Sequence, residues 1–343
     1  MHKFQKQVLF TGQKHGYYLY RIPSLVVSKK NTVLAFCEAR RHTGADDDEI
    51  DIAMRRSFNN GKTWDEQHII VSDGIRTCSN PCPVVDMVTG TILLVFCKDN
   101  QQVFLTKSHD DGQTWTEPKE ITNTTKNPNW TYLGTGPGHG IQLKSNRILI
   151  PGWSDTSPGL PTWRNPPPIW GKIQSSYAFY SDDGGENWVL GDEMTTNASD
   201  ECEAVELENG LIYMTMRSRQ NKKQRAYSYS NDQGHTWTPV EYDPNLPEPS
   251  CQGSIIQFDT EKILLCYPSD KTERAKLTIR LSNDNCRTWS INKMIEQDGS
   301  AYSDLVVTQT KQILCLYEKR EEDASTDERH IALASFKIDW VKE

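Results

Sequence analysis

The chain has 343 residues, with 38 Lys and Arg against 46 Asp and Glu, and a formal net charge of -8 at pH 7. This acidic balance argues against a nucleic-acid binder, and an anionic ligand would need a local cationic pocket. No stretch approaches 18 apolar residues, and the first ten residues lack a long apolar run. The sequence therefore predicts neither a membrane span nor a signal peptide, and a cytoplasmic location with peripheral membrane association left open.

Nine cysteines are scattered along the chain, and most lie in apolar runs, such as those around Cys37, Cys97, Cys266 and Cys315. Buried free thiols of a reducing compartment are the interpretation that we favour over disulfides. Cys78 and Cys82 lie close together, but no second Cys or His pair completes a zinc set. We therefore expect no metal and no cofactor.

Five octapeptides of the form Ser-x-Asp-x-Gly-x-Thr-Trp, some of them degenerate, recur along the chain at 57–64, 108–115, 181–188, 230–237 and 282–289. Their starts are 51, 73, 49 and 52 residues apart. A period near 50 with four strands per repeat is typical of β-propellers. Within the repeat, Asp and Asn favour a turn, Gly supplies φ > 0, and Trp anchors the turn in an apolar layer.

Apolar runs predict strands at 92–97, 148–150, 211–216, 263–267 and 313–317, and helical periodicity is hard to find. The sequence thus predicts an all-β fold, a six-bladed β-propeller, as a single domain over residues 1–343. Two stretches break the rhythm. A Pro- and Trp-rich insertion at 154–172 is predicted to border a pocket, and the charged stretch at 319–329 is predicted to be a solvated loop.

Near the start of the chain, Arg21 stands between an aromatic residue and Ile-Pro, just before an apolar strand. This motif, the repeated octapeptides (Asp boxes), and the segments at 80–83, 136–140, 301–305 and 315–318 together resemble the sialidase superfamily. The resemblance covers nearly the whole chain and is nearest to the vertebrate cytosolic type. It implies a retaining exo-α-sialidase acting on sialylated glycolipids, glycoproteins or oligosaccharides.

The resemblance implies three arginines that bind the carboxylate of sialic acid, and by position these are Arg21, Arg217 and Arg274. Planar carboxylates are held well by guanidinium groups, which offer paired N–H donors. Glu318 resembles the acid that orients the first arginine. Further residues that the resemblance places at the pocket are Glu38, Arg40, Asn80 and Pro81.

Tyr302 matches the nucleophile of the family. A neutral phenol avoids the repulsion that a carboxylate nucleophile would meet from the carboxylate of the substrate, and sialidases are an exception to the two-carboxylate rule. A phenol titrates near pH 10 and needs a base. Glu201 matches that base, with Glu203 and Glu206 as competitors in the same run.

Asp46, in the acidic run at 46–51, matches the acid/base, with Asp47 as the alternative. Three positions depart from the family pattern: Asn129 stands where a glutamate is expected, and Trp153 and Asp155 stand where two tyrosines contact the glycerol tail. These changes leave open a hydrolase for another nonulosonic acid, such as the deaminated form, or a trans-sialidase. A non-catalytic glycan-binding propeller is a further alternative, which would not need the three catalytic residue types together.

Overall fold

The computed structural model describes residues 4–157, 173–320 and 329–343. Most of the predicted insertion at 154–172 and of the predicted loop at 319–329 therefore lies outside the described residues. The described chain consists mainly of β-strands, with two short helices, α1 (Thr122–Thr125) and α2 (Ile338–Lys342). Neither helix has the length and hydrophobicity that crossing a bilayer would require. The prediction of an all-β fold is confirmed.

Three sheets are four-stranded antiparallel meanders in which each strand pairs with the next along the chain. The first contains β2 (Leu19–Val27), β3 (Val33–Arg40), β4 (Ile50–Ser57) and β5 (His68–Val71). The second contains β6 (Cys78–Val85), β7 (Ile92–Lys98), β8 (Gln102–Ser108) and β9 (Lys119–Glu120). The third contains β15 (Ser199–Glu206), β16 (Ile212–Ser218), β17 (Gln224–Ser230) and β18 (Glu241–Pro247).

A five-stranded sheet contains β10 (Tyr132–Thr135), β11 (Ile141–Gln142), β12 (Ile148–Asp155), β13 (Gln174–Ser181) and β14 (Val189–Leu190). A seven-stranded sheet contains β19 (Ser254–Gln257), β20 (Ile263–Pro268), β21 (Ala275–Ser282), β22 (Ile291–Val307), β23 (Ile313–Arg320), β24 (Arg329–Phe336) and β1 (Gln5–Thr11). Its long strand β22 pairs with β21 through residues 291–299 and with β23 through residues 300–307. Strand β1 pairs with β24, so the two ends of the chain share one sheet.

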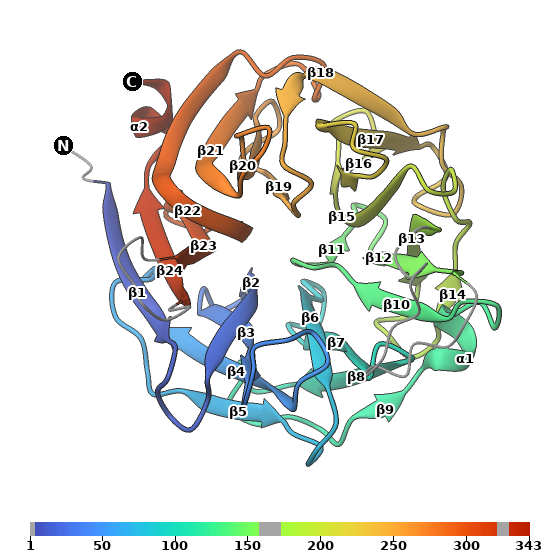
Figure 1. Cartoon of the computed structure of the whole chain (residues 1–343), viewed down its shortest axis with the longest axis vertical. Helices are drawn as coiled ribbons and strands as arrows, with labels where there is room; N and C mark the ends of the chain where they lie inside the picture. The colour runs from blue at the N-terminus through green and yellow to red at the C-terminus, as the bar shows by residue number, and fades with distance from the viewer. Residues whose placement is uncertain (1–3, 158–172, 321–328) are drawn as a thin grey trace.

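The sheets stand around a ring (Figure 1), with β2, β6, β15 and β19 nearest the centre and β5, β9 and β18 towards the rim. The face of each sheet packs on its neighbour, and one core cluster joins Phe36 of the first sheet to Phe96 of the second. The strands β2, β3, β6 and β7 are buried along almost their whole length. Burial on both faces explains the near-continuous apolar runs of β3 and β7, which alternation alone would not produce.

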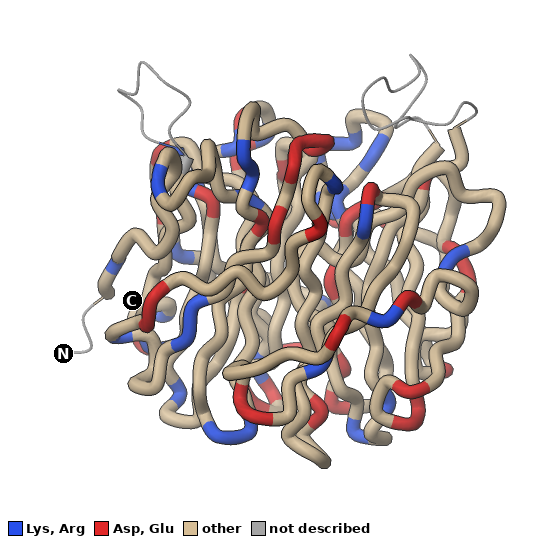
Figure 2. The backbone as a smooth tube through the Cα atoms, turned by 90° about the horizontal axis from the view of Figure 1, so that it is seen from below, with Lys and Arg blue, Asp and Glu red and all other residues tan. Residues whose placement is uncertain are grey.

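Charged residues of both signs are mixed around the two ends of the ring, and neither sign covers one side of the described chain (Figure 2). The net charge of -8 is therefore spread over the surface, and the charge chemistry of any one pocket depends on its local residues.

The Asp boxes form tight turns after the third strand of a sheet. In the second box, the Ser108 hydroxyl accepts the Gly112 N–H at 2.8 Å, and the Asp110 carboxylate accepts the Thr114 N–H at 2.8 Å. Gly112 has φ +79, and a Cβ there would lie 2.4 Å from Leu34 of the first sheet. The turn therefore requires glycine for its backbone conformation and for close contact with the neighbouring sheet.

The boxes and the predicted site residues lie at opposite ends of the strands. In the first sheet, Leu19 pairs with Arg40 and Arg40 with Ile50, whereas Val33 pairs with Ser57, where the first box begins. The starts of the first strands and the ends of the second strands therefore meet at one end of the ring. This is the end at which the site forms.

Candidate active site

A cavity of about 270 Å³ opens at this end of the ring. It brings together ten of the residues that the sequence singled out: Arg21, Glu38, Arg40, Asp46, Asn80, Trp153, Glu201, Arg217, Arg274 and Tyr302. They come from several sheets and are separated by up to 281 positions in sequence, from Arg21 to Tyr302. Convergence of these remote residues on one cavity was the main structural requirement of the sequence interpretation.

A β-bulge recurs in four of the strands that reach the cavity. Residues 22–23 of β2, 80–81 of β6, 200–201 of β15 and 301–302 of β22 each oppose a single residue of the next strand. A bulge bends its strand and re-aims a side chain, and bulges are frequent beside functional sites. Here the repeated bulge presents Asn80, Glu201 and Tyr302 to the cavity.

Two of these bulges hold a residue in the left-handed backbone region, and a carboxylate secures each of them. Ile22 and Asn80 both have φ 54, a conformation that asparagine tolerates but that is strained for the β-branched side chain of Ile22. The Ile22 N–H donates to Glu318 at 3.0 Å, and the Asn80 N–H donates to Glu38 at 2.8 Å. Buried hydrogen bonds to these carboxylates keep the strained segments in place.

Three guanidinium groups surround the Tyr302 ring. The Cζ atoms of Arg21 and Arg274 lie 5.2 and 5.3 Å from the ring centroid. Arg217 lies at the hydroxyl, with Nη1 at 3.3 Å from the phenol oxygen. These three cations are thus gathered at one phenol and form a local cationic patch, in which acids pair with Arg21 and Arg217.

Tyr302 and Glu201 form a close phenol–carboxylate pair. The Tyr302 hydroxyl donates to Glu201 Oε1 at 2.5 Å, and Arg217 Nη1 donates to Glu201 Oε2 at 2.9 Å. Burial works against ionisation of Glu201, but Arg217 and the phenol outweigh it and lower the pKa of the carboxyl. Burial and the adjacent Glu201 raise the pKa of Tyr302 well above its usual value. The resting pair is therefore an ionised carboxylate beside a neutral phenol.

Asp46 lies at the rim of the cavity, on the loop between β3 and β4. Its side chain is 66% exposed, and Oδ1 contacts Arg40 Nη1 at 2.7 Å and Arg21 Nη1 at 3.2 Å. Desolvation favours the neutral acid, but Arg40 and Arg21 outweigh it and lower the pKa of Asp46 to about 2. In the empty cavity this carboxyl is ionised.

Two further ion pairs fix the arginines that contact Asp46. Arg40 donates from Nε to Glu38 at 2.9 Å, and both side chains are almost fully buried. Arg21 donates from Nε to Glu318 at 3.1 Å. If such an arginine turned away from its acid, a buried charge would be left without a partner, which costs free energy. Each acid therefore holds its arginine in one orientation.

Four predicted residues do not line the cavity. Glu318 acts from behind it through Arg21, and Pro81 is buried in β6 beside Asn80. Asp155 is fully buried at the end of β12, where its carboxylate accepts the Ser157 N–H at 2.6 Å. Asn129 is exposed in a turn, and its N–H donates to the Asn127 side chain.

The competitors for the base lie elsewhere. Glu206 accepts the Lys144 N–H at 2.7 Å, away from the cavity lining. Glu203 belongs to a fully buried cluster with His139 and Asp304, in which His139 Nδ1 lies 2.7 Å from Asp304 and 3.2 Å from Glu203. Within the described ranges this is the group of side chains with spacing suited to a metal ion. The imidazole and backbone N–H groups, such as that of Leu25 at 2.6 Å from Asp304, already occupy the carboxylates, so the cluster needs no ion.

Several lining residues escaped the sequence interpretation: Ile22, Ser79, Asn100, Tyr132, Gln174, Asp200 and Arg219. Two of them carried a detectable signal. Asp200 directly precedes Glu201, and Arg219 follows Arg217 at the two-residue spacing that keeps side chains on one face of a strand. Arg219 pairs with Asp200 at 3.2 Å. Burial raises the pKa of Asp200 to about 6, against the opposing effect of Arg217.

The remaining missed residues had no such signal. Tyr132 lies in β10, and its ring centroid is 5.2 Å from that of Trp153 of β12, with the rings tilted by 32°. Gln174 of β13 lies opposite Asp155. Only the pairing of these strands brings the residues to the cavity wall. Trp153 and Tyr132 thus form an aromatic part of the cavity lining, while three of the arginines lie around Tyr302.

The chain is similar to known proteins in sequence and in fold. A family model described as a BNR repeat-like domain matches residues 31–315. Sialidase-2 of Cricetulus griseus is 30% identical, over 92% of this chain and 92% of the relative. A sialidase of Bacteroides fragilis (strain YCH46) is 29% identical over 87% of this chain, which spans 60% of that relative. Among solved structures, a Hadza microbial sialidase has a TM-score of 0.85 and 25% identity, with 98% of this chain and 69% of that chain covered.

Proposed function

Because this chain belongs to the sialidase superfamily, we propose that it is an exo-α-sialidase, which removes terminal sialic acid from glycoconjugates with retention of configuration. The observation that carries the proposal is the gathering of Arg21, Arg217 and Arg274 around Tyr302, whose hydroxyl donates to Glu201. A cationic patch beside a phenol–carboxylate pair suits a sugar whose carboxylate is attached to the reacting carbon.

Substrate binding begins at the three arginines. They receive the substrate carboxylate, and because this group is attached to the anomeric carbon, that carbon is brought to the Tyr302 hydroxyl. Holding the carboxylate near the plane of the anomeric carbon and its two ring neighbours helps the sugar approach an oxocarbenium-like geometry, because the anomeric carbon is planar in that state. Arg21 and Arg217 are themselves fixed by Glu318 and Glu201, so binding requires little rearrangement.

Two displacements follow. As positive charge develops at the anomeric carbon, Glu201 takes the Tyr302 proton and the phenol oxygen forms a covalent bond to the sugar, while the glycosidic bond breaks and the leaving oxygen takes a proton from Asp46. In the second step, Asp46 takes a proton from water. The water oxygen attacks the anomeric carbon, the bond to Tyr302 breaks, and the phenol recovers its proton from Glu201. Two inversions leave the configuration retained.

Asp46 must be protonated for the first step, although its pKa in the empty cavity is about 2. Binding of the substrate raises this pKa. Its carboxylate competes for Arg21, which is one of the two arginines that contact Asp46 directly. Once Arg21 is neutralised by the substrate, the pKa of Asp46 rises and the carboxyl takes up the proton that it later donates.

Replacing Tyr302 with Phe tests the nucleophile. The Tyr302→Phe variant should lose at least about 100-fold in kcat on an aryl sialoside, because the covalent route is closed. Tyr227→Phe is the matched control, since its hydroxyl also donates to a carboxylate, that of Glu241 at 2.6 Å, but lies outside the cavity lining. Near wild-type turnover by the Tyr302 variant would refute the assignment. NMR of the first released sugar tests retention, which requires the α-anomer to appear first.

The finer architecture and the location are part of the same proposal. Counting the two halves of β22 as belonging to separate blades, 291–299 with β21 and 300–307 with β23, supports a six-bladed propeller as one domain. The nine free, buried cysteines support a reducing, cytoplasmic location.

A further inference from the structure

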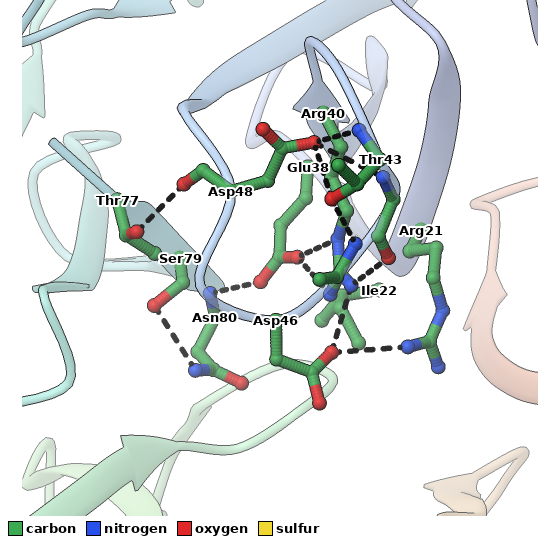
Figure 3. A network of polar contacts seen from close by, with 12 residues as sticks. Arg21, Ile22, Glu38, Arg40, Thr43, Asp46, Asp48, Thr77, Ser79 and Asn80 are labelled. Carbon is green, nitrogen blue, oxygen red and sulfur yellow. Dashed lines mark hydrogen bonds and ion pairs between the residues drawn. The ribbon is translucent and has the colours of Figure 1, made fainter. Parts of the chain in front are cut away.

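We propose that Asp48 is a positioning residue for Asp46: its carboxylate gathers the loop between β3 and β4 and thereby holds Asp46 against Arg21 and Arg40 (Figure 3). This inference rests on the acid role of Asp46 in the proposed function. It concerns a residue that does not line the cavity and does not touch the reacting atoms.

The Asp48 carboxylate serves as an internal anion for the loop backbone. Oδ2 accepts the N–H groups of His42, Thr43 and Gly44 at 2.9, 2.7 and 3.0 Å, and Oδ1 accepts the Glu49 N–H at 2.8 Å. Successive N–H groups that converge in this way form a nest for negative charge. Burial alone would raise the pKa of Asp48, but these four N–H groups outweigh it and lower the pKa, so the carboxylate stays charged.

The same loop connects Asp48 to Asp46 through Arg40. The Gly44 carbonyl accepts Arg40 Nη1 at 2.7 Å, and the same Nη1 donates to Asp46 Oδ1 at 2.7 Å. The Asp48 N–H closes the intervening turn on the Ala45 carbonyl at 3.3 Å. Asp46 is therefore carried on a short turn whose two ends, residues 42–44 and 48–49, are both tied to the Asp48 carboxylate.

Asp46 depends on this support because most of its side chain faces solvent. Apart from the two arginine contacts, its exposed side chain has little packing to fix its position. By contrast, Asp48 is 7% exposed, and its carbonyl accepts the hydroxyl of buried Thr77 at 2.7 Å. Thr77 precedes β6, so the loop is anchored to the second sheet as well as the first.

Gly44 adds a steric reason for this loop path. It has φ +75, and a Cβ there would lie 2.2 Å from Leu19 at the start of β2. The loop therefore passes close to the strand that carries Arg21, and the three N–H groups bonded to Asp48 fix that approach. Loss of the Asp48 carboxylate should let Asp46 drift by the small distance that disables proton transfer.

The experiment compares two substrates that differ in their need for an acid: an aryl sialoside with an acidic phenol as leaving group, and a sialyl-galactoside with an alkyl alcohol. An alkyl alkoxide leaves poorly unless it is protonated, so the second substrate depends more on Asp46. Asp48→Asn should lower kcat on the sialyl-galactoside by about 10-fold more than on the aryl sialoside, with KM for the aryl sialoside changed less than about 2-fold. Asp46→Asn should show the same selectivity with larger amplitude.

The matched control is Asp110→Asn. Asp110 also accepts two backbone N–H groups, from Gln113 and Thr114, but it lies in an Asp box at the other end of the strands. This variant should slow neither substrate selectively. If Asp48→Asn fails to fold, Thr77→Val removes only the anchor on the Asp48 carbonyl and should show the same selectivity more weakly.

The outcomes separate the two proposals. Selective loss in Asp46→Asn but equal loss on both substrates in Asp48→Asn would overturn the positioning role and leave the proposed function intact. No selectivity in Asp46→Asn, or a wild-type protein that cleaves neither substrate, would overturn the acid role and the inference that rests on it.

Discussion

Binding of sialic acid should be accompanied by proton uptake, because the cavity is close to charge balance before the ligand arrives. Five arginines line it, at positions 21, 40, 217, 219 and 274. Four acids line it, at positions 38, 46, 200 and 201, and Glu318 pairs with Arg21 from behind. A ligand carboxylate adds one negative charge to this set. Among the acids, Asp46 is the group most directly affected, since the ligand competes with it for Arg21.

The size of the effect follows from the pKa of Asp46. It is about 2 without a ligand, and Arg21 is one of three cations that lower it, together with Arg40 and Arg274. Loss of one close opposite charge raises a carboxyl pKa by about 1–3 units, so the complex should have a value of roughly 3–5. At pH 4 this corresponds to uptake of about 0.1–0.9 proton. Because the complex holds more protons than the empty protein, affinity should fall as pH rises through the pKa of Asp46 in the complex.

Isothermal titration calorimetry with N-acetylneuraminic acid measures this uptake. The observed enthalpy, plotted against the ionisation enthalpy of several buffers at one pH, has a slope equal to the number of protons taken up. Asp46→Asn should abolish the slope, whereas Asp200→Asn should leave it largely in place at pH 4, because the pKa of Asp200 is about 6 and this carboxyl is already protonated there. A zero slope for the wild type, or an unchanged slope in Asp46→Asn, would refute the reasoning.

Two predictions concern the fold. Gly138→Ala should lower the free energy of unfolding by about 2–4 kcal/mol in urea titrations, because φ is +117 and the new Cβ would lie 2.0 Å from Glu203. The control Gly210→Ala, at φ +83 with no atom near the new Cβ, should lower it by only about 1 kcal/mol. Equal losses in the two variants would contradict the steric argument. A thiol reagent should label the native protein slowly and all nine cysteines after unfolding in denaturant, since every thiol is free and buried; fewer than nine would mean disulfides.

The sequence predicted the strands and turns well because their signals are local. The apolar runs at 92–97 and 263–267 are strands β7 and β20, and the boxes are turns with positive φ at their fifth residue. Even Cys286, which replaces the usual Gly of the fifth box, adopts φ 64 and donates its N–H to Ser282 as Gly112 does to Ser108. Short-range hydrogen bonds decide these turns, so the neighbouring sheets do not have to be known.

The cavity walls were predicted less well, because they depend on long-range pairing. Asn129 was matched to a glutamate by its neighbouring Trp, yet it is exposed in a turn, and Asn100 lines the cavity instead. Asn100 lies between β7 and β8 at φ 49, and its side chain donates to the Leu133 carbonyl at 3.1 Å. Asn100 and Asn129 are both polar residues in turns, and the sequence gives no sign of which one reaches the cavity. The contact between Asn100 and β10 decides it.

The choice between Glu201 and Glu203 illustrates what the fold adds. Both lie on β15 two residues apart, as Tyr302 and Asp304 do on β22, and this spacing alone would place each pair on one face of its strand. The bulges at 200–201 and 301–302 aim the first member of each pair into the cavity, where Glu201 meets Tyr302. The second members lie deeper, where Glu203 and Asp304 share the imidazole of His139. A bulge exists only where two residues of one strand lie opposite one residue of its partner strand. The sequence of β15 alone therefore does not reveal which of its glutamates a bulge turns into the cavity. The pairing with β16 places Glu201 at the cavity, as the proposed role of a base requires, and leaves Glu203 in the buried cluster with His139.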